Sequence, residues 1–327
     1  IVGNAECVGE GDFLVGDEFQ AVVRDDNHGI DLIGEVGNAG LSLFHTVCTF
    51  KAEGLRHDGD SQDARVVRDL RSRGHRYVSE WQPRHDPLRH DGLTGPADEF
   101  TQIGYEQARP GQEFLKIGVG TLRRFSDQPY DRFRLYEIAD PGIREVTAER
   151  DRVGFRHRLL SDEYGYDYRK TLRLTDAPGL RIEYTLKNLG PAPLTGHVYN
   201  HNFFTPDRMA TGPDTSIHFP FRPEGTWREA YDSVALTPDG IAFSRPLNPG
   251  ESVFMGDLHG QDPEAREYGF SLRNLRTGAG IRVSGSGKLS HMVFWACPTA
   301  ACLEPYTPFR VFPGETGVWH IDYELLV

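Results

Sequence analysis

Alternation of apolar and polar residues is the feature that most limits how this chain folds. In LRIEYTLKN, the apolar Leu180, Ile182, Tyr184 and Leu186 alternate with polar residues. GVWHIDYEL near the end of the sequence repeats the pattern, and shorter examples are FRHRLL, KTLRLT, GIRVSG and HMVFWAC. A period of two is typical of strands with one buried face. No comparably long helical pattern competes with it.

Glycine and proline separate these alternating stretches. The 327 residues include 36 Gly and 21 Pro, and turn sequences such as DAPG, NLGPAP and NPGES lie between the stretches. Short strands joined by such turns favour antiparallel pairing. The sequence therefore predicts an all-β protein, with one large antiparallel β-sandwich over residues 66–327. Residues 1–65 alternate poorly, and we expect an N-terminal extension or edge segment of uncertain order there.

The charge balance argues against two classes of partner. The 48 Asp and Glu residues outnumber the 36 Lys and Arg residues, for a formal net charge of −12. This excess repels the phosphates of nucleic acids and the surface of anionic membranes. The best candidate for a membrane helix, residues 289–303, falls short of the ~18–20 apolar residues required and is interrupted by His291 and Pro298. We therefore expect neither nucleic acid nor membrane as a partner.

The four cysteines, Cys7, Cys48, Cys297 and Cys302, do not amount to a disulfide framework in a chain of this length. The spacing in CPTAAC is wider than the C-x-x-C of zinc and redox sites, and we favour free thiols over a Cys297–Cys302 bridge.

The sequence opens on Ile1-Val2-Gly3, without a basic segment followed by an apolar run. No targeting segment is visible in it. The compartment stays open, with the cytoplasm slightly favoured.

A histidine stands among amides and aromatic residues in VYNHNFF, residues 198–204. On a strand, His197 and His201 would project from one face with their Cβ atoms about 13 Å apart, too far to share a metal ion. The H-x-x-x-H spacing suits zinc on a helix, but the neighbouring Gly and aromatic residues favour a strand. We therefore predict no metal and no other cofactor. An isolated histidine of this kind is usually a core residue bonded to a backbone carbonyl.

The surrounding segment changes that interpretation. LRIEYTLKNLGPAPLTGHVYNHNFF, residues 180–204, resembles the aldose 1-epimerase (galactose mutarotase-like) superfamily. In that family a strand ending in Asn, a proline-containing turn and a second strand running into N-H-x-Y-F-N form a recurrent motif, which Asn188 and residues 200–204 match. ACLEPYTPFRVFPGETGVWHIDYEL resembles the family's closing segment, in which a catalytic glutamate follows a strand and precedes Pro. The resemblance implies that His201 is a general acid and Glu304 a general base.

Such a pair matches the chemistry of sugar anomers. Opening a pyranose requires a base that takes the proton of the anomeric hydroxyl and an acid that protonates the ring oxygen. The resemblance therefore implies an isomerase acting on a small-molecule carbohydrate. We expect His201 and Glu304 at the ends of neighbouring strands, facing each other across one sugar-sized cleft at a separation of several ångströms. We expect Asn200 to orient His201 or to bond a sugar hydroxyl.

Two other motifs of the family are replaced. GPADEF, residues 95–100, stands where the family has G-R-x-A-N-R, and KIGVG, residues 116–120, stands where it has a second histidine in H-G-G. We predict Lys116, His90 and Glu99 as further substrate-binding residues, and Lys116 as a partner for the acidic group of a modified sugar. The alternative for each is an ordinary surface charge.

Three functions stay open at this point. The first is anomer interconversion, the second is a polysaccharide lyase or glycoside-cleaving enzyme on the same fold, and the third is a non-catalytic sugar-binding protein. The presence of both His201 and Glu304 argues against the third, because binding alone needs no acid and base. The replaced motifs argue against a plain galactose or glucose epimerase. The sequence names neither the sugar nor the oligomeric state.

Overall fold

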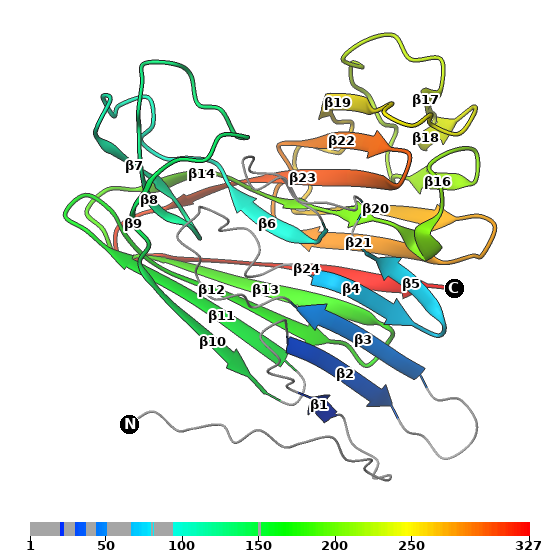
Figure 1. Cartoon of the computed structure of the whole chain (residues 1–327), viewed down its shortest axis with the longest axis horizontal. Helices are drawn as coiled ribbons and strands as arrows, with labels where there is room; N and C mark the ends of the chain where they lie inside the picture. Colours follow the sequence, from blue (N-terminus) through cyan, green and yellow to red (C-terminus); the bar gives the residue numbers. More distant parts are fainter. Residues whose placement is uncertain are drawn as a thin grey trace.

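The computed structural model is built almost entirely of strands (Figure 1). It describes the backbone of three strands before residue 51, and then residues 67–79, 81, 94–149 and 152–327. These ranges contain a single short helical element, the 3-10 turn η2 (Pro206–Arg208). Within them no helix has the length and apolar character needed to span a membrane.

Eleven strands form the larger sheet, and every pair in it is antiparallel. In order across the sheet they are β1 (Gln20–Val22), β2 (Ile30–Val36), β3 (Phe44–Phe50), β4 (Val67–Ser72), β5 (His75–Val78), β15 (Phe203–Phe204), β23 (Ala300–Val311), β14 (Leu194–His201) and β6 (Ala97–Phe100). Strand β22 (His291–Cys297) also pairs with β23, and β19 (Val253–Leu258) pairs with β22. The segment before residue 66, for which we expect an extension or edge segment, contributes β1 to β3 at one edge of this sheet.

Ten strands form the second sheet, and three more form a small one. The order in the second sheet is β10 (Ile143–Ala148), β11 (Arg152–Leu160), β12 (Gly165–Leu174), β13 (Gly179–Asn188), β24 (Thr316–Leu326), β21 (Gly280–Ser286), β20 (Glu267–Asn274), β16 (Thr215–His218), β18 (Gly240–Phe243) and β17 (Val234–Thr237). The small sheet consists of β7 (Glu113–Lys116), β8 (Gly120–Arg123) and β9 (Ile138–Asp140).

The two large sheets pack face to face around one core. The alternating stretches of the sequence lie in β11, β12, β13, β21, β22 and β24, which confirms the predicted antiparallel β-sandwich. The four apolar residues of LRIEYTLKN are each at most 1% exposed. Polar bonds also cross the core: Tyr77 Oη donates to the carbonyl of Leu326 at 3.1 Å, and Tyr323 Oη donates to Asn202 Oδ1 at 3.0 Å. Buried polar groups are thus paired between the sheets.

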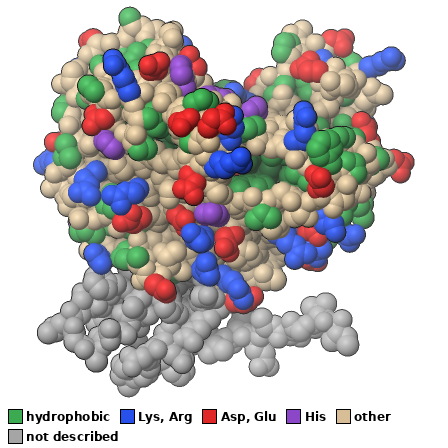
Figure 2. All heavy atoms as spheres, turned by 180° about the vertical axis from the view of Figure 1, so that it is seen from behind, with side chains coloured by type: hydrophobic (Ala, Val, Ile, Leu, Met, Phe, Trp, Pro, Cys, Tyr) green, Lys and Arg blue, Asp and Glu red, His purple; other side chains and the backbone are tan. Residues whose placement is uncertain are grey.

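Two raised parts flank the outer face of the larger sheet. Figure 1 shows the small sheet β7–β9 at one end and the region of β17 to β19 at the other, with β6, β14, β22 and β23 crossing the molecule beneath them. Figure 2 shows the same molecule from behind, hollowed between two lobes, with histidine side chains visible at the floor of the hollow. Residues that point outward from β14 and β23 therefore face this hollow.

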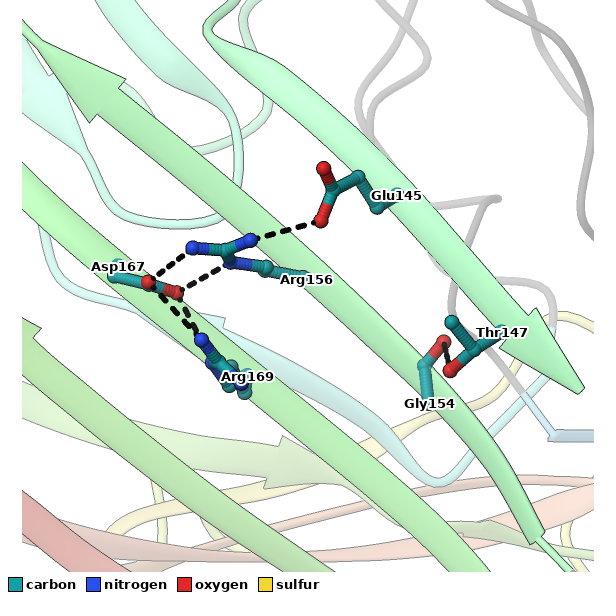
Figure 3. A network of polar contacts seen from close by, with 6 residues as sticks. All are labelled: Glu145, Thr147, Gly154, Arg156, Asp167 and Arg169. Atoms are coloured by element: carbon teal, nitrogen blue, oxygen red, sulfur yellow. Dashed lines mark hydrogen bonds and ion pairs between the residues drawn. The ribbon is translucent and has the colours of Figure 1, made fainter. Parts of the chain in front are cut away.

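An ion-pair network fastens the edge of the second sheet (Figure 3). Arg156 on β11 donates to both carboxylate oxygens of Asp167 on β12, at 3.0 and 2.7 Å, and to Glu145 on β10 at 3.0 Å. The hydrogen bonds from Arg156, helped by Arg169, lower the pKa of Asp167 to about 2, although partial burial opposes them. Three consecutive strands are thus joined through one guanidinium.

We expect this network to make the fold sensitive to acid. The pKa of Asp167 in the folded protein lies below its ordinary value of 3.8, so its contribution is complete above about pH 4 and is lost as the pH falls toward 2. Asp167→Asn should lower the midpoint of thermal unfolding at neutral pH by on the order of 2 °C. Thermal unfolding followed by circular dichroism should show this difference shrinking toward pH 2. A difference independent of pH, or one shared by the exposed Asp162→Asn, would contradict this assignment.

Candidate active site

Strands β14 and β23 place His201 directly opposite Glu304. Val198 pairs with Thr307, and the same register continues where β15 meets β23. Nδ1 of His201 lies 2.6 Å from Oε1 of Glu304. From the sequence we expect His201 and Glu304 at the ends of neighbouring strands, with their side chains several ångströms apart. His201 does end β14, but Glu304 lies inside β23 and touches the histidine, because opposite residues on paired strands are the nearest cross-strand neighbours.

A second carboxylate, that of Glu99, bonds the other ring nitrogen of His201. Strand β6 pairs with β14 on the side away from β23, and Glu99 Oε2 lies 2.9 Å from Nε2 of His201. Lys116, at the end of β7, donates from Nζ to the other oxygen of Glu99 at 2.5 Å. The structure thus brings four of the predicted residues into one chain of contacts: Lys116, Glu99, His201 and Glu304.

The two carboxylates decide the protonation state of His201. Burial alone would lower the pKa of the ring, but the charge of Glu304 and the hydrogen bonds to Cys302, Glu304 and Glu99 outweigh it and raise the pKa well above 6.5. Both ring nitrogens then carry hydrogen and donate to carboxylates. Burial also opposes the charge of Lys116, and Glu99 outweighs that effect and raises the pKa of the ammonium. The site therefore alternates cations and carboxylates.

Aromatic rings hold His201 in place. Phe203 stacks on it with ring centroids 5.6 Å apart and planes 3° apart, and Tyr199 meets it edge-on at 5.1 Å. Tyr306 stacks on Tyr199 at 4.1 Å. Burial, with the charge of Glu304, raises the pKa of Tyr306 to about 12. This phenol keeps its proton at neutral pH, so it donates hydrogen bonds and does not act as a base.

Asn200 lies on the opposite face of β14. Successive side chains of a strand point to opposite faces. Asn200 is 2% exposed and its Nδ2 donates to Tyr184 Oη at 3.0 Å, between the two large sheets. Contrary to the expectation from the sequence, this side chain neither reaches His201 nor faces the hollow. His90 lies outside the described residues, and its role in substrate binding stays a prediction.

Cys302 is a member of the site that the sequence analysis missed. It is a free, buried thiol, as is Cys297, which confirms free thiols over a bridge between the two. Its Sγ lies 3.5 Å from Oε1 of Glu304. A signal for it exists in the sequence, because a step of two along a strand keeps the same face. Such a step from Glu304 reaches Cys302 in one direction and Tyr306 in the other.

His201, Cys302 and Glu304 also form a set of possible metal ligands. One ligand atom from each lies within 4.8 Å of the others. The distance of about 13 Å that separates His197 from His201 along one strand does not limit this set, because its three residues come from two paired strands.

Arg132, on the loop between β8 and β9, adds a positive charge near the site. Burial opposes its charge, but the nearby tyrosines Tyr199 and Tyr306 and the carboxylates Glu99 and Glu304 outweigh burial and raise the pKa of the guanidinium. This loop carries no motif, so nothing in the sequence marks Arg132.

Gly95 allows the GPADEF segment to approach the end of β14. A Cβ atom at this position would lie 1.9 Å from the carbonyl oxygen of His201. Only glycine fits so close to another backbone. The segment that replaces the family's arginine motif therefore packs directly against the end of β14.

Solved structures with this architecture cover nearly the whole chain. The Slr1438 protein from Synechocystis is 15% identical over 90% of this chain and 96% of that chain, with a TM-score of 0.53. A galactose mutarotase-like protein from Clostridium acetobutylicum is 12% identical over 90% of this chain and 98% of its own, with a TM-score of 0.51. The chain has the galactose mutarotase-like fold. The resemblance seen in the sequence is thus confirmed for the fold.

Other members of the galactose mutarotase-like fold include a proposed aldose 1-epimerase from Klebsiella pneumoniae. It is 10% identical over 91% of this chain and 84% of its own, with a TM-score of 0.54. No protein-family model matches the sequence, and no curated protein is significantly similar to it. At these identities the comparisons establish the fold, and the activity has to be argued from the site.

Proposed function

We propose that this protein is a carbohydrate-active isomerase of the aldose 1-epimerase type, which interconverts the anomers of a sugar. The observation that carries the proposal is the contact of 2.6 Å between His201 and Glu304 on the outer face of the larger sheet. An imidazolium and a carboxylate on one face supply the acid and the base that the reaction requires. Structural neighbours described as aldose 1-epimerases or mutarotase-like proteins support this choice.

The reaction starts when a sugar replaces the bond between His201 and Glu304. The anomeric hydroxyl then donates to Glu304, and the ring oxygen accepts from Nδ1 of His201. Transfer of both protons breaks the bond between C1 and the ring oxygen and leaves an open-chain aldehyde. Rotation about the C1–C2 bond and the reverse transfers close the ring as the other anomer, with no net change in protons. Glu99 bonds Nε2 of His201, so the imidazole ring offers Nδ1 to the sugar both when the sugar ring opens and when it closes.

The pairing of Lys116 favours a neutral sugar over an acidic one. The sequence suggests Lys116 as a partner for an acidic substituent. Its ammonium is instead bonded to Glu99 and buried, with 5% of the side chain exposed. A cation already paired in a buried site has little attraction left for a second anion. We assign Lys116 to holding Glu99 against His201.

Lys116→Met should therefore slow anomer exchange without changing the preference between sugars. The variant leaves the buried carboxylate of Glu99 with His201 as its cation but without the ammonium that holds its other oxygen, and we expect rates to fall by about tenfold or more. The ratio of kcat/KM for a uronate to that for the parent aldose should stay the same. Lys187→Met, at an exposed lysine on β13, is the matched control. A loss confined to the uronate would return Lys116 to substrate binding.

A panel of aldoses and uronates tests the proposal itself. Exchange between anomers should be measured by polarimetry and by NMR, in parallel with an ultraviolet assay for the unsaturated products of a lyase. Faster anomer exchange without new chain ends supports the isomerase. An absorbing product would select the polysaccharide lyase, and new reducing ends would select a glycoside-cleaving enzyme. Binding of sugar with neither reaction would select a sugar-binding protein.

A further inference from the structure

Three side chains of different chemistry converge at the proposed catalytic pair. Nδ1 of His201 lies 2.6 Å from Oε1 of Glu304, and Sγ of Cys302 lies 3.5 Å from the same oxygen. The ligand atoms are thus a nitrogen, a sulfur and an oxygen, all within 4.8 Å of one another. Zn²⁺ uses this set of ligands in proteins, whereas Ca²⁺ and Mg²⁺ take oxygen.

The distances between these ligand atoms are close to those around a tetrahedral Zn²⁺ ion. With Zn–N of about 2.0 Å and Zn–S of about 2.3 Å, neighbouring ligand atoms lie roughly 3.3–3.6 Å apart. The contact of 3.5 Å between Cys302 and Glu304 already falls in this range. The contact between His201 and Glu304 has to lengthen by about 0.7 Å, and the ring nitrogen of His201 and Sγ of Cys302, which lie within 4.8 Å of each other, have to come to about 3.5 Å. A change in two side-chain rotamers supplies that movement without moving the strands.

The surroundings of His201 resemble those of a metal-binding histidine. Such histidines usually donate their second ring nitrogen to a carboxylate, which orients the ring and increases its basicity. Here Nε2 bonds Glu99 at 2.9 Å, and Lys116 bonds the other oxygen of Glu99. Cys302 is fully buried, whereas the His201 side chain is 17% exposed. An ion from the hollow would therefore pass the histidine ring to reach the thiol, with its fourth position toward the proposed sugar site.

We infer that the protein binds Zn²⁺ through Nδ1 of His201, Sγ of Cys302 and the carboxylate of Glu304, and that the bound ion inhibits it. Binding releases the proton of the thiol and the proton on Nδ1 to solvent, because both atoms bind a metal only through a free electron pair. Inhibition rests on the proposed function: the ion would occupy the nitrogen of the acid and the carboxylate of the base together. The metal is not needed for catalysis.

Cobalt provides a test of binding that involves no sugar. The full-length chain, treated with EDTA and kept reduced, should take up one equivalent of Co²⁺ with a thiolate-to-cobalt charge-transfer band and the strong visible bands of a four-coordinate ion. Cys302→Ser should lose the charge-transfer band, and Cys297→Ser, at another buried cysteine, should keep it. Glu99→Gln should keep the band and weaken binding by about 10- to 100-fold.

Zinc then links binding to activity. One equivalent of Zn²⁺ should raise the thermal midpoint of the wild type and not that of Cys302→Ser. It should also abolish anomer exchange by a protein that is fully active in EDTA. Absence of the cobalt charge-transfer band in the wild type, or its persistence in Cys302→Ser, would overturn the inference. If Cys302→Ser fails to fold, the inference is overturned when both Glu304→Gln and Glu99→Gln bind cobalt as tightly as the wild type does. A chain that shows the band but exchanges no anomers supports the metal site and refutes the proposed function.

Discussion

Replacing His201 by Asn, or Glu304 by Gln, is expected to reduce the rate of anomer exchange by about 10²–10⁴-fold. Each change keeps the approximate size of the side chain but removes one proton-transferring group. The two residues touch at 2.6 Å and, in the proposed mechanism, act in one transition state, so neither retains its function when the other is lost. The double variant should consequently be little slower than either single one. NMR exchange rates on the three proteins, at saturating sugar, measure this directly.

Matched changes elsewhere separate chemistry from folding. His320→Asn and Glu183→Gln alter a half-exposed histidine on β24 and an exposed glutamate on β13, both on the second sheet. They should leave the exchange rate within about twofold of the wild type. Single variants of His201 or Glu304 that retain most of the rate, while folded by circular dichroism, would rule out the proposed acid and base roles. So would a double variant whose loss equals the product of the single losses.

The strands could be predicted from the sequence because burial on one face leaves a local pattern. LRIEYTLKN became β13 and GVWHIDYEL became β24, and these two strands pair with each other. That pairing itself could not be predicted, because the two segments are far apart in the sequence and alternation says nothing of the neighbouring strand. Nor did any pattern reveal that β6, near residue 100, joins β14 and carries Glu99 to His201.

The candidate site could be predicted only in part for the same reason. The resemblance named His201 and Glu304, but their direct contact follows from the register between β14 and β23. The sequence predicts Asn200 in the site because it adjoins His201, whereas the side chains of adjacent residues on a strand point to opposite faces. The pairing of Lys116 with Glu99 depends on how β7 packs beside β6, a long-range arrangement that neither motif encodes. Local patterns thus specified the strands, and their pairing specified the site.

A second charged pair lies between the two large sheets, beneath the pair of Lys116 and Glu99, and helps to position it. Lys170 on β12 is fully buried and forms an ion pair with Asp98 on β6, the residue before Glu99. Tyr168 Oη donates to the other oxygen of Asp98 at 2.5 Å. Because neighbouring residues of β6 face opposite ways, Asp98 binds the strand to the second sheet while Glu99 faces His201. The pair therefore fixes the position of the strand whose Glu99 bonds His201.

Lys170→Met is expected to destabilise the fold by about 3–5 kcal/mol, the cost of leaving one partner of a buried ion pair without the other. The change preserves most of the volume, so the loss reflects the missing ammonium beside the Asp98 carboxylate rather than a cavity. Adding Asp98→Asn should recover much of the stability, since it removes the uncompensated charge, and Lys187→Met at an exposed position should cost less than about 0.5 kcal/mol. Urea unfolding of the four proteins gives these differences. A single variant as stable as the wild type, or a double variant no more stable than Lys170→Met, would show that the ion pair does not hold β6 to the second sheet.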